Sequence, residues 1–224
     1  MTANVIKALD KIKNNSIFNQ ALYFTGGTAL SYFINHRVSE DIDIVSAQTL
    51  KYREIISAMT ELGAVKIQDE NVTALRMAGL FPDEYMLKFI LDDVKIDFFQ
   101  ANRPIQKKIL KDSSYTQYQD TTLKILNVKS IAKLKFVALL QRDKLRDLYD
   151  FGAILEQGIL SIEDIIFISK ELHNITSLNG LISHLEIKTE SLDDESVYLT
   201  ETHRVDLSFN DIKDSLLKKV KRLI

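Results

Sequence analysis

Residues 22–45 read LYFTGGTALSYFINHRVSEDIDIV, and this stretch contains the pattern that decides the fold. The short apolar segment 22–24 predicts a strand, and residues 29–35 are typical of a helix. Between them lies Thr25-Gly26-Gly27-Thr28, and the stretch ends in residues 41–45, where acidic and apolar side chains alternate as in a half-buried strand. The order strand, glycine bend, helix and acidic strand is the core around which the rest of the chain is interpreted.

Two carboxylates in this stretch are candidates for metal binding. Asp41 and Asp43 are two residues apart in the predicted strand, so both side chains leave the same face. Two carboxylates at this separation repel each other, and burying either one without a partner is costly. A divalent cation between them would remove both problems. The alternative is that the pair is simply the exposed edge of an amphipathic strand.

A third acid, Asp97, lies in the mostly apolar segment 94–99, which also predicts a strand. An acid in such a strand needs a partner, and a metal shared with Asp41 and Asp43 is one candidate. Carboxylates that hold two metal ions can clamp the attacking and leaving oxygens of a phosphoryl transfer. The alternative is that Asp97 pairs with Lys95 or another nearby cation.

The double-glycine bend is a candidate phosphate-binding element. Gly26 and Gly27 allow the backbone to approach a bulky anion, and the amides that begin the following helix favour phosphate. Thr28 is expected either to cap that helix or to donate a hydrogen bond to a phosphate oxygen. Ser39, two residues before Asp41, either orients the loop or is an ordinary turn residue. An ordinary turn with a cap is the alternative for the whole element.

The remaining pattern divides the chain into an α/β part, residues 1–126, and a helical part, residues 127–224. Helices are expected over residues 2–14 and 49–62, with Gly63 ending the second. The β-like runs are residues 64–68, 72–78, 85–91 and 94–99. Asp92-Asp93 predicts a tight hairpin between the last two runs.

Composition excludes several classes of site. The chain has no cysteine, and its four histidines lack the spacing of a metal site, so any bound metal should be a hard cation held by oxygen. The formal net charge of −2 gives no sign of a general nucleic-acid-binding surface. No window reaches transmembrane length and no signal peptide is recognisable, so we expect a cytoplasmic protein without membrane contact.

The ordered motifs G-G-T-A-L, R-V-S-E-D-I-D-I and K-I-D-F resemble the nucleotidyltransferase fold of the DNA polymerase β superfamily. A further segment, K-F-V-A-L-L-Q-R followed by R-D-L-Y-D, makes the chain similar to the AbiEii/AbiGii toxin family within it. The resemblance covers residues 20–155. It implies an α+β fold, a mixed sheet with flanking helices, followed by a helical C-terminal region.

The resemblance also implies roles for individual residues. Gly26 and Gly27 would bind the triphosphate, and Asp41 and Asp43 would hold Mg²⁺ or Mn²⁺. Asp97 would ligate metal or help to deprotonate the attacking hydroxyl. Two further implied assignments concern the helical part, namely Lys135 as a nucleotide contact and Asp147 or Asp150 as members of a second functional cluster.

Spacing gives a separate hypothesis for that second cluster. No glycine or proline interrupts residues 128–151, so they are expected to form one helix. Lys135, Arg142, Arg146 and Asp150 would then share a face. Either a polyanion such as the nucleotide lies across this face, or it is a solvated face where Asp147 and Asp150 neutralise the arginines.

The expected activity is transfer of a nucleoside monophosphate from a nucleoside triphosphate to an acceptor hydroxyl. In family terms the chain would be the toxin of a toxin–antitoxin pair, with tRNA as the acceptor and an antitoxin protein as a partner. Two alternatives remain open: nucleotidylation of a small molecule such as an antibiotic, and a catalytically silent module that senses a nucleotide or binds a partner.

Overall fold

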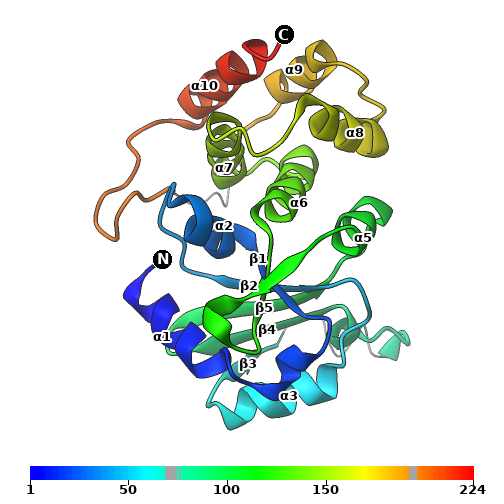
Figure 1. The fold of residues 1–224 in the computed structure, drawn as a ribbon, viewed down its shortest axis with the longest axis vertical. Coiled ribbons are helices and arrows are strands. Elements are labelled where there is room, and N and C mark those ends of the chain that lie inside the picture. Colours follow the sequence, from blue (N-terminus) through cyan, green and yellow to red (C-terminus); the bar gives the residue numbers. More distant parts are fainter. Residues whose placement is uncertain (69–74, 76, 192–195) are drawn as a thin grey trace. The chain divides into compact units, whose positions relative to one another are not determined.

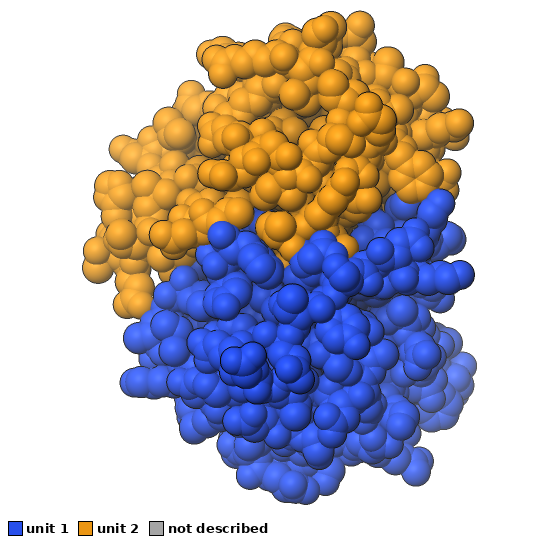
Figure 2. Space-filling view, in the orientation of Figure 1, with its two compact units in different colours: residues 1–33, 39–127 blue, residues 34–38, 128–224 orange. Residues whose placement is uncertain are grey.

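The computed structural model describes residues 1–68, 75, 77–191 and 196–224. The chain divides into two compact units, coloured separately in Figure 2. Unit 1 comprises residues 1–33 and 39–127, and unit 2 comprises residues 34–38 and 128–224. Residues 34–38 therefore belong to the helical unit, although they interrupt the α/β unit in sequence. Within the described ranges, no helix is both long enough and apolar enough to cross a membrane.

Unit 1 is built on one mixed sheet, whose described strands follow the order β3-β4-β5-β2-β1-β7-β6. Figure 1 labels β1, β2, β3, β4 and β5 of this sheet. The pairs β2–β5 and β1–β7 are parallel, and the other neighbouring pairs are antiparallel. This arrangement confirms the predicted α+β class with a mixed sheet. The strands are β1 Tyr23–Thr25, β2 Ile42–Ser46, β3 Val65–Ile67, β4 Met86–Leu91, β5 Val94–Gln100, β6 Tyr115–Gln117 and β7 Lys124–Leu126.

The central strands β2 and β5 show why the sheet places polar side chains together. Ile42 and Ile44 of β2, like Ile96 and Phe98 of β5, are fully buried. Because successive side chains alternate between faces, the intervening acidic residues leave the opposite face. The apolar halves of the two strands thus fix the direction of their polar halves.

Three helices of unit 1, over residues 3–12, 52–61 and 104–111, are amphipathic and bury one stripe each. In α1, the buried residues Val5, Ala8, Leu9 and Ile12 recur at the helical period. The expected helix over residues 49–62 is α3, and Gly63 follows its end with a φ of +85°. The helices are α1 Ala3–Ile12, α2 Gly26–Ile34, α3 Tyr52–Glu61 and α5 Pro104–Lys111, with the short 3₁₀ helices η1 Ser16–Asn19, η2 Pro82–Glu84 and η3 Tyr118–Asp120.

The predicted hairpin between β4 and β5 is confirmed. Asp92 and Asp93 have φ values of +50° and +63°, as the two central residues of a type I′ turn require, and Leu91 pairs with Val94. The run at residues 72–78 lies largely outside the described residues. Its described members are Leu75 and Met77, which are helical, and Ala78, which lies in a turn, so the strand prediction is wrong at those three positions.

Unit 2 is helical. Its buried contacts include Phe136 of α6 and Phe151 of α7, whose rings stack with centroids 4.4 Å apart. Capping boxes begin two of its helices, with Ser161 paired with Asp164 and Ser208 paired with Asp211. The helices are α6 Val128–Gln141, α7 Leu145–Glu156, α8 Ile162–His173, α9 Leu178–Glu186 and α10 Phe209–Lys221.

The expected single helix over residues 128–151 is wrong, because the chain breaks at residues 142–144 between α6 and α7. Lys188 explains the break physically. Its ammonium, only 5% exposed, lies 3.1 Å from the backbone carbonyl oxygen of Arg142 and 2.7 Å from the Asp143 carboxylate. A distant cation therefore satisfies a carbonyl group at the break and pairs with the residue beside it.

Candidate active site

The bend between β1 and α2 lies directly against Asp43. Thr25, the last residue of β1, pairs with Asp43 of β2, and α2 begins at the next residue, Gly26. Gly26 has a φ of +77°, and a Cβ atom at this position would lie 1.9 Å from Asp43 Oδ2. Glycine is therefore required twice, for the backbone conformation and for the space that the Asp43 carboxylate occupies.

Thr28 ties the start of α2 to the start of β2. It is fully buried inside the first turn of α2, so it does not cap the helix, and its hydroxyl donates a hydrogen bond to the backbone carbonyl of Asp41. Gly27 is also buried in this turn. Ser39 is buried two residues before Asp41. The loop that carries the first carboxylate is thus attached to the glycine bend.

The parallel pairing of β2 with β5 places Asp43 directly opposite Asp97. The Asp97 side chain is 14% exposed, and its Oδ2 atom lies 2.8 Å from Lys95 Nζ. Its Oδ1 atom is buried and finds no hydrogen-bond partner among the described residues. Leaving a carboxylate oxygen buried and unpaired is costly, which indicates that a further group belongs at this point.

The pKa of Lys95 responds to all three acids, Asp43 and Asp97 on the paired strands β2 and β5 and Asp41 just before β2. Burial lowers the pKa of Lys95, but the hydrogen bond with Asp97 and the negative charges of Asp97, Asp41 and Asp43 together raise it above its ordinary value. Lys95 is therefore a cation that lies close enough to these acids to be affected by their charges. The predicted alternative pairing of Asp97 with Lys95 is also observed.

These residues fit a divalent cation in type. Carboxylate oxygens are the ligands that Mg²⁺ and Mn²⁺ prefer. The Oδ1 atom of Asp97, which has no hydrogen-bond partner among the described residues, could serve as such a ligand on the strand next to Asp43. As the side chains stand in the described part of the chain, no three histidine or acidic residues are already arranged as a complete ligand set.

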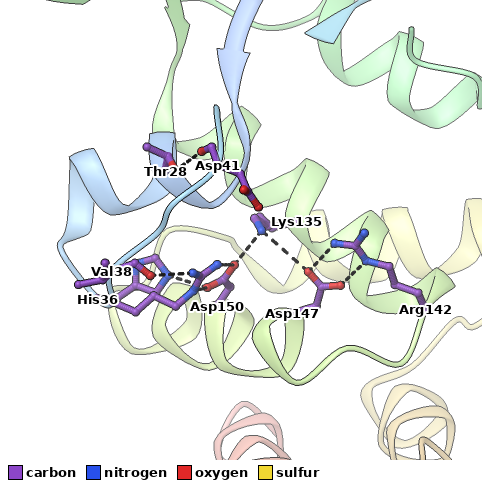
Figure 3. A network of polar contacts seen from close by, with 9 residues as sticks. Thr28, His36, Val38, Asp41, Lys135, Arg142, Asp147 and Asp150 are labelled. Atoms are coloured by element: carbon purple, nitrogen blue, oxygen red, sulfur yellow. Dashed lines mark hydrogen bonds and ion pairs between the residues drawn. The ribbon is translucent and has the colours of Figure 1, made fainter. Parts of the chain in front are cut away.

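Unit 2 contains a second cluster, built around the completely buried Asp150 (Figure 3). Arg37 contacts both carboxylate oxygens at 2.6 and 3.1 Å, His36 Nε2 lies 2.7 Å from Oδ1, and Lys135 Nζ lies 2.8 Å from Oδ2. Burial alone would raise the pKa of Asp150. The charges of Lys135 and Arg37 and the hydrogen bonds from His36 and Arg37 instead hold this pKa well below its usual range.

Asp147 extends this cluster. It is 1% exposed and accepts two hydrogen bonds from the Arg142 guanidinium, at 2.5 and 3.0 Å, while Lys135 Nζ lies 3.9 Å away. Asp147 and Asp150 are therefore both buried, so the alternative of a solvated face does not hold for these two residues. The predicted common face of Lys135, Arg142 and Arg146 along one helix is wrong, because Arg142 lies in the break and Arg146 lies in α7.

His36 and Arg37 are the site residues that sequence reasoning missed. They precede the acidic strand by a few positions, but their partner Asp150 is more than 110 residues away in the chain. A histidine and an arginine next to each other, just before a candidate catalytic strand, are the only local signal. Nothing in that signal identifies the acid with which they pair.

Comparisons with known proteins agree with the fold and the motifs. The family model described as nucleotidyl transferase AbiEii toxin, type IV toxin–antitoxin system, matches residues 7–196. An uncharacterized protein from Aquifex aeolicus (strain VF5) is 26% identical over 170 residues, which cover 75% of this chain and 74% of the relative.

Two solved structures share the fold at low sequence identity. A candidate nucleotidyltransferase from H. pylori gives a TM-score of 0.53 at 15% identity, covering 100% of this chain and 96% of that one. MenT4, a nucleotidyltransferase toxin from Mycobacterium tuberculosis H37Rv, gives a TM-score of 0.57 at 12% identity, covering 97% and 82%. With the match of the family model over most of its length, the chain belongs to the AbiEii family of nucleotidyl transferase toxins and is a nucleotidyltransferase.

Proposed function

We propose that this enzyme transfers a nucleoside monophosphate from a nucleoside triphosphate to an acceptor hydroxyl, using Mg²⁺ or Mn²⁺ held by Asp41, Asp43 and Asp97. The observation that carries the proposal is the contact of three features within unit 1. The Gly26 backbone abuts the Asp43 carboxylate, and Asp43 faces Asp97, whose Oδ1 atom is buried and unpaired. A phosphate-binding bend next to hard oxygen ligands suits a triphosphate with its metal.

The acceptor oxygen attacks the α-phosphorus, the bond from that phosphorus to the oxygen bridging to the β-phosphorus breaks, and pyrophosphate leaves. We assign the proton of the acceptor hydroxyl to the carboxylate of Asp97. A bound divalent cation would supply positive charge to the triphosphate during transfer. The Gly26 and Gly27 backbone would orient the phosphates, and Thr28 would hold the Asp41 loop in place.

For unit 2 we propose that Lys135 contacts the nucleotide and that Asp150 positions it. Lys135 is 11% exposed and is held by Asp150 at 2.8 Å. Asp150 in turn is fixed by Arg37 and His36, so the ammonium group is positioned before any ligand arrives. Arg142 and Arg146 are proposed as further contacts to phosphate, with Asp147 orienting the Arg142 guanidinium.

The family points to a biological setting that we adopt as part of the proposal. We propose that the chain is the toxin of a type IV toxin–antitoxin pair acting in the cytoplasm, with tRNA as acceptor and an antitoxin as its partner. The family resemblance supports tRNA as the acceptor. The net charge of −2 does not add to that support, because it gives no sign of a general nucleic-acid-binding surface.

The test is label transfer by purified protein. Each α-labelled nucleoside triphosphate is incubated with Mg²⁺ or Mn²⁺ and total RNA, or with aminoglycosides in a parallel reaction. We expect label in the tRNA fraction, and at least a hundredfold less with Asp43→Asn. Asp93→Asn is the matched control, because Asp93 is exposed in the turn that precedes β5 and asparagine tolerates its φ of +63°. Absence of label in every acceptor would refute the proposal, and label only in the aminoglycosides would replace its acceptor.

A further inference from the structure

Unit 2 contains a pocket that the proposed transfer does not use. Its volume is about 390 Å³, and it is lined by α7, α10, the segment at residues 34–36 and Leu207. Leu148, Ile212 and Leu216 provide apolar walls. Pockets of about 300–1,000 Å³ with apolar walls and a few polar groups are typical of small-molecule sites.

One residue that lines this pocket has a buried nitrogen that is not hydrogen-bonded. His36 lines the pocket with a side chain only 5% exposed, and its Nδ1 atom has no hydrogen-bond partner within the described residues. The Asp150 carboxylate can only accept, so the proton between the two residues belongs to His36 Nε2. In the tautomer that carries its single proton on Nε2, Nδ1 is an acceptor.

Other lining groups describe the shape and polarity of a ligand. Tyr149 also lines the pocket, and its ring lies nearly parallel to the His36 ring, with centroids 6.3 Å apart and an angle of 24°, so two aromatic residues border the cavity. Lys219 also lines the pocket, and its ammonium pairs with Glu156 at 2.8 Å. Gly152 makes room for it, since a Cβ atom there would lie 3.1 Å from Lys219 Nζ.

We propose that this pocket binds a nucleobase, which donates an N–H group to His36 Nδ1 and packs a ring face against Tyr149. A nucleobase combines the required features, because it has flat apolar faces and N–H donors at its edge. Other planar molecules also carry N–H donors, and the choice of a nucleobase among them rests on the proposed function. The base comes either from a free nucleotide or from the RNA acceptor, and it would complete the hydrogen bonding of the histidine that positions Asp150.

The test measures binding to the full chain without metal. Isotope-labelled protein is titrated with adenosine, guanosine, cytidine and uridine, with the corresponding monophosphates, and with a short single-stranded RNA. We expect a saturable change in the His36 Nδ1 chemical shift and nuclear Overhauser effects between the base and the Tyr149 ring. A base that binds at least tenfold more tightly within RNA identifies the acceptor as its source, whereas equal or weaker binding within RNA identifies a free nucleotide.

Two substitutions fill the pocket from different helices, so the test does not depend on the folding of either variant alone. Ala153→Phe fills it from α7, and Ser215→Trp fills it from an exposed position on α10. We expect both to weaken nucleoside binding at least tenfold, and His36→Phe to do the same through loss of the acceptor. The control His203→Phe replaces an exposed histidine outside the pocket and should leave binding unchanged.

The proposal is overturned if no ligand shifts the pocket resonances at millimolar concentration. It is equally overturned if both filled variants fold and bind like the parent protein. Asp43→Asn distinguishes this result from failure of the proposed function, because that variant should lose label transfer while keeping nucleoside binding. Label transfer without any binding at the pocket would leave the enzyme assignment standing and remove the pocket assignment.

Discussion

Replacing Gly26 with alanine introduces two costs that can be separated. The first is the left-handed backbone at φ +77°, which costs a residue with a Cβ atom about 1–2 kcal/mol. The second is steric, because the new Cβ would lie 1.9 Å from Asp43 Oδ2 and 2.7 Å from Asp43 Cβ. A contact this close to the backbone of β2 cannot be relieved by rotating a side-chain end, and overpacking of this kind costs about 1–3 kcal/mol.

Gly63→Ala is the matched control for the first cost. Gly63 has a similar φ of +85°, and a Cβ atom there meets nothing within 4 Å. We therefore expect Gly63→Ala to lower the free energy of unfolding by about 1–2 kcal/mol, and Gly26→Ala to lower it by about 2–5 kcal/mol. Urea denaturation of both variants under identical conditions measures the difference.

Label transfer separates the same two variants. Since the alanine displaces the Asp43 carboxylate, Gly26→Ala should lose at least tenfold in transfer rate under conditions where it remains folded. Gly63→Ala should keep the parental rate. Equal stability and equal activity of the two variants would show that the bend does not abut a functional carboxylate.

Three further substitutions test other parts of the structure. Thr28→Val removes the buried hydroxyl that donates to the Asp41 carbonyl, so the free energy of unfolding should fall by about 1–3 kcal/mol and label transfer should also fall. Unchanged values of both would contradict a positioning role for Thr28. Asp150→Asn leaves Arg37 and Lys135 without their carboxylate partner, so the free energy of unfolding should fall by about 3–5 kcal/mol in the same denaturation assay. A fall of less than about 1 kcal/mol would contradict a stabilising role for the charge cluster around Asp150. At Asp164, burial raises the pKa, but hydrogen bonds from Lys129 and Lys133 outweigh it and lower the pKa to about 2, below the ordinary 3.8. This carboxylate stabilises the fold above pH 4, and its contribution is lost as the pH falls from 4 to 2. Thermal denaturation of Asp164→Asn should therefore show a smaller drop in stability over that range than the parent protein, and an identical drop would remove Asp164 as a cause of acid sensitivity.

Local patterns predicted much of unit 1. Alternation at residues 41–45 predicted the strand that carries Asp43, and the mostly apolar run at residues 94–99 predicted the strand that carries Asp97. Asp92-Asp93 predicted the hairpin, because few residue types adopt positive φ at two successive positions. That β2 pairs with β5, which places the two carboxylates opposite each other, depends on contacts between distant strands and could only be hypothesised.

The features that were missed depend on partners far away in sequence. No glycine or proline marks the break at residues 142–144, which Lys188 stabilises from 45 and 46 residues away. The buried pairing of His36 and Arg37 with Asp150 has the same character. Pattern reasoning describes one element at a time, so it could not predict a buried charge network formed by three separate segments.

The most direct test of the central claim is to locate Mn²⁺ in crystals of the full chain. These should be grown with Mn²⁺ and a nucleoside triphosphate analogue whose α–β bridging oxygen is replaced by methylene, so that transfer cannot occur. We predict an anomalous Mn²⁺ peak in contact with the carboxylates of Asp41, Asp43 and Asp97, with the phosphates against the Gly26 backbone. Nucleotide bound without a Mn²⁺ peak at these carboxylates, or a peak held by other residues, would contradict the account.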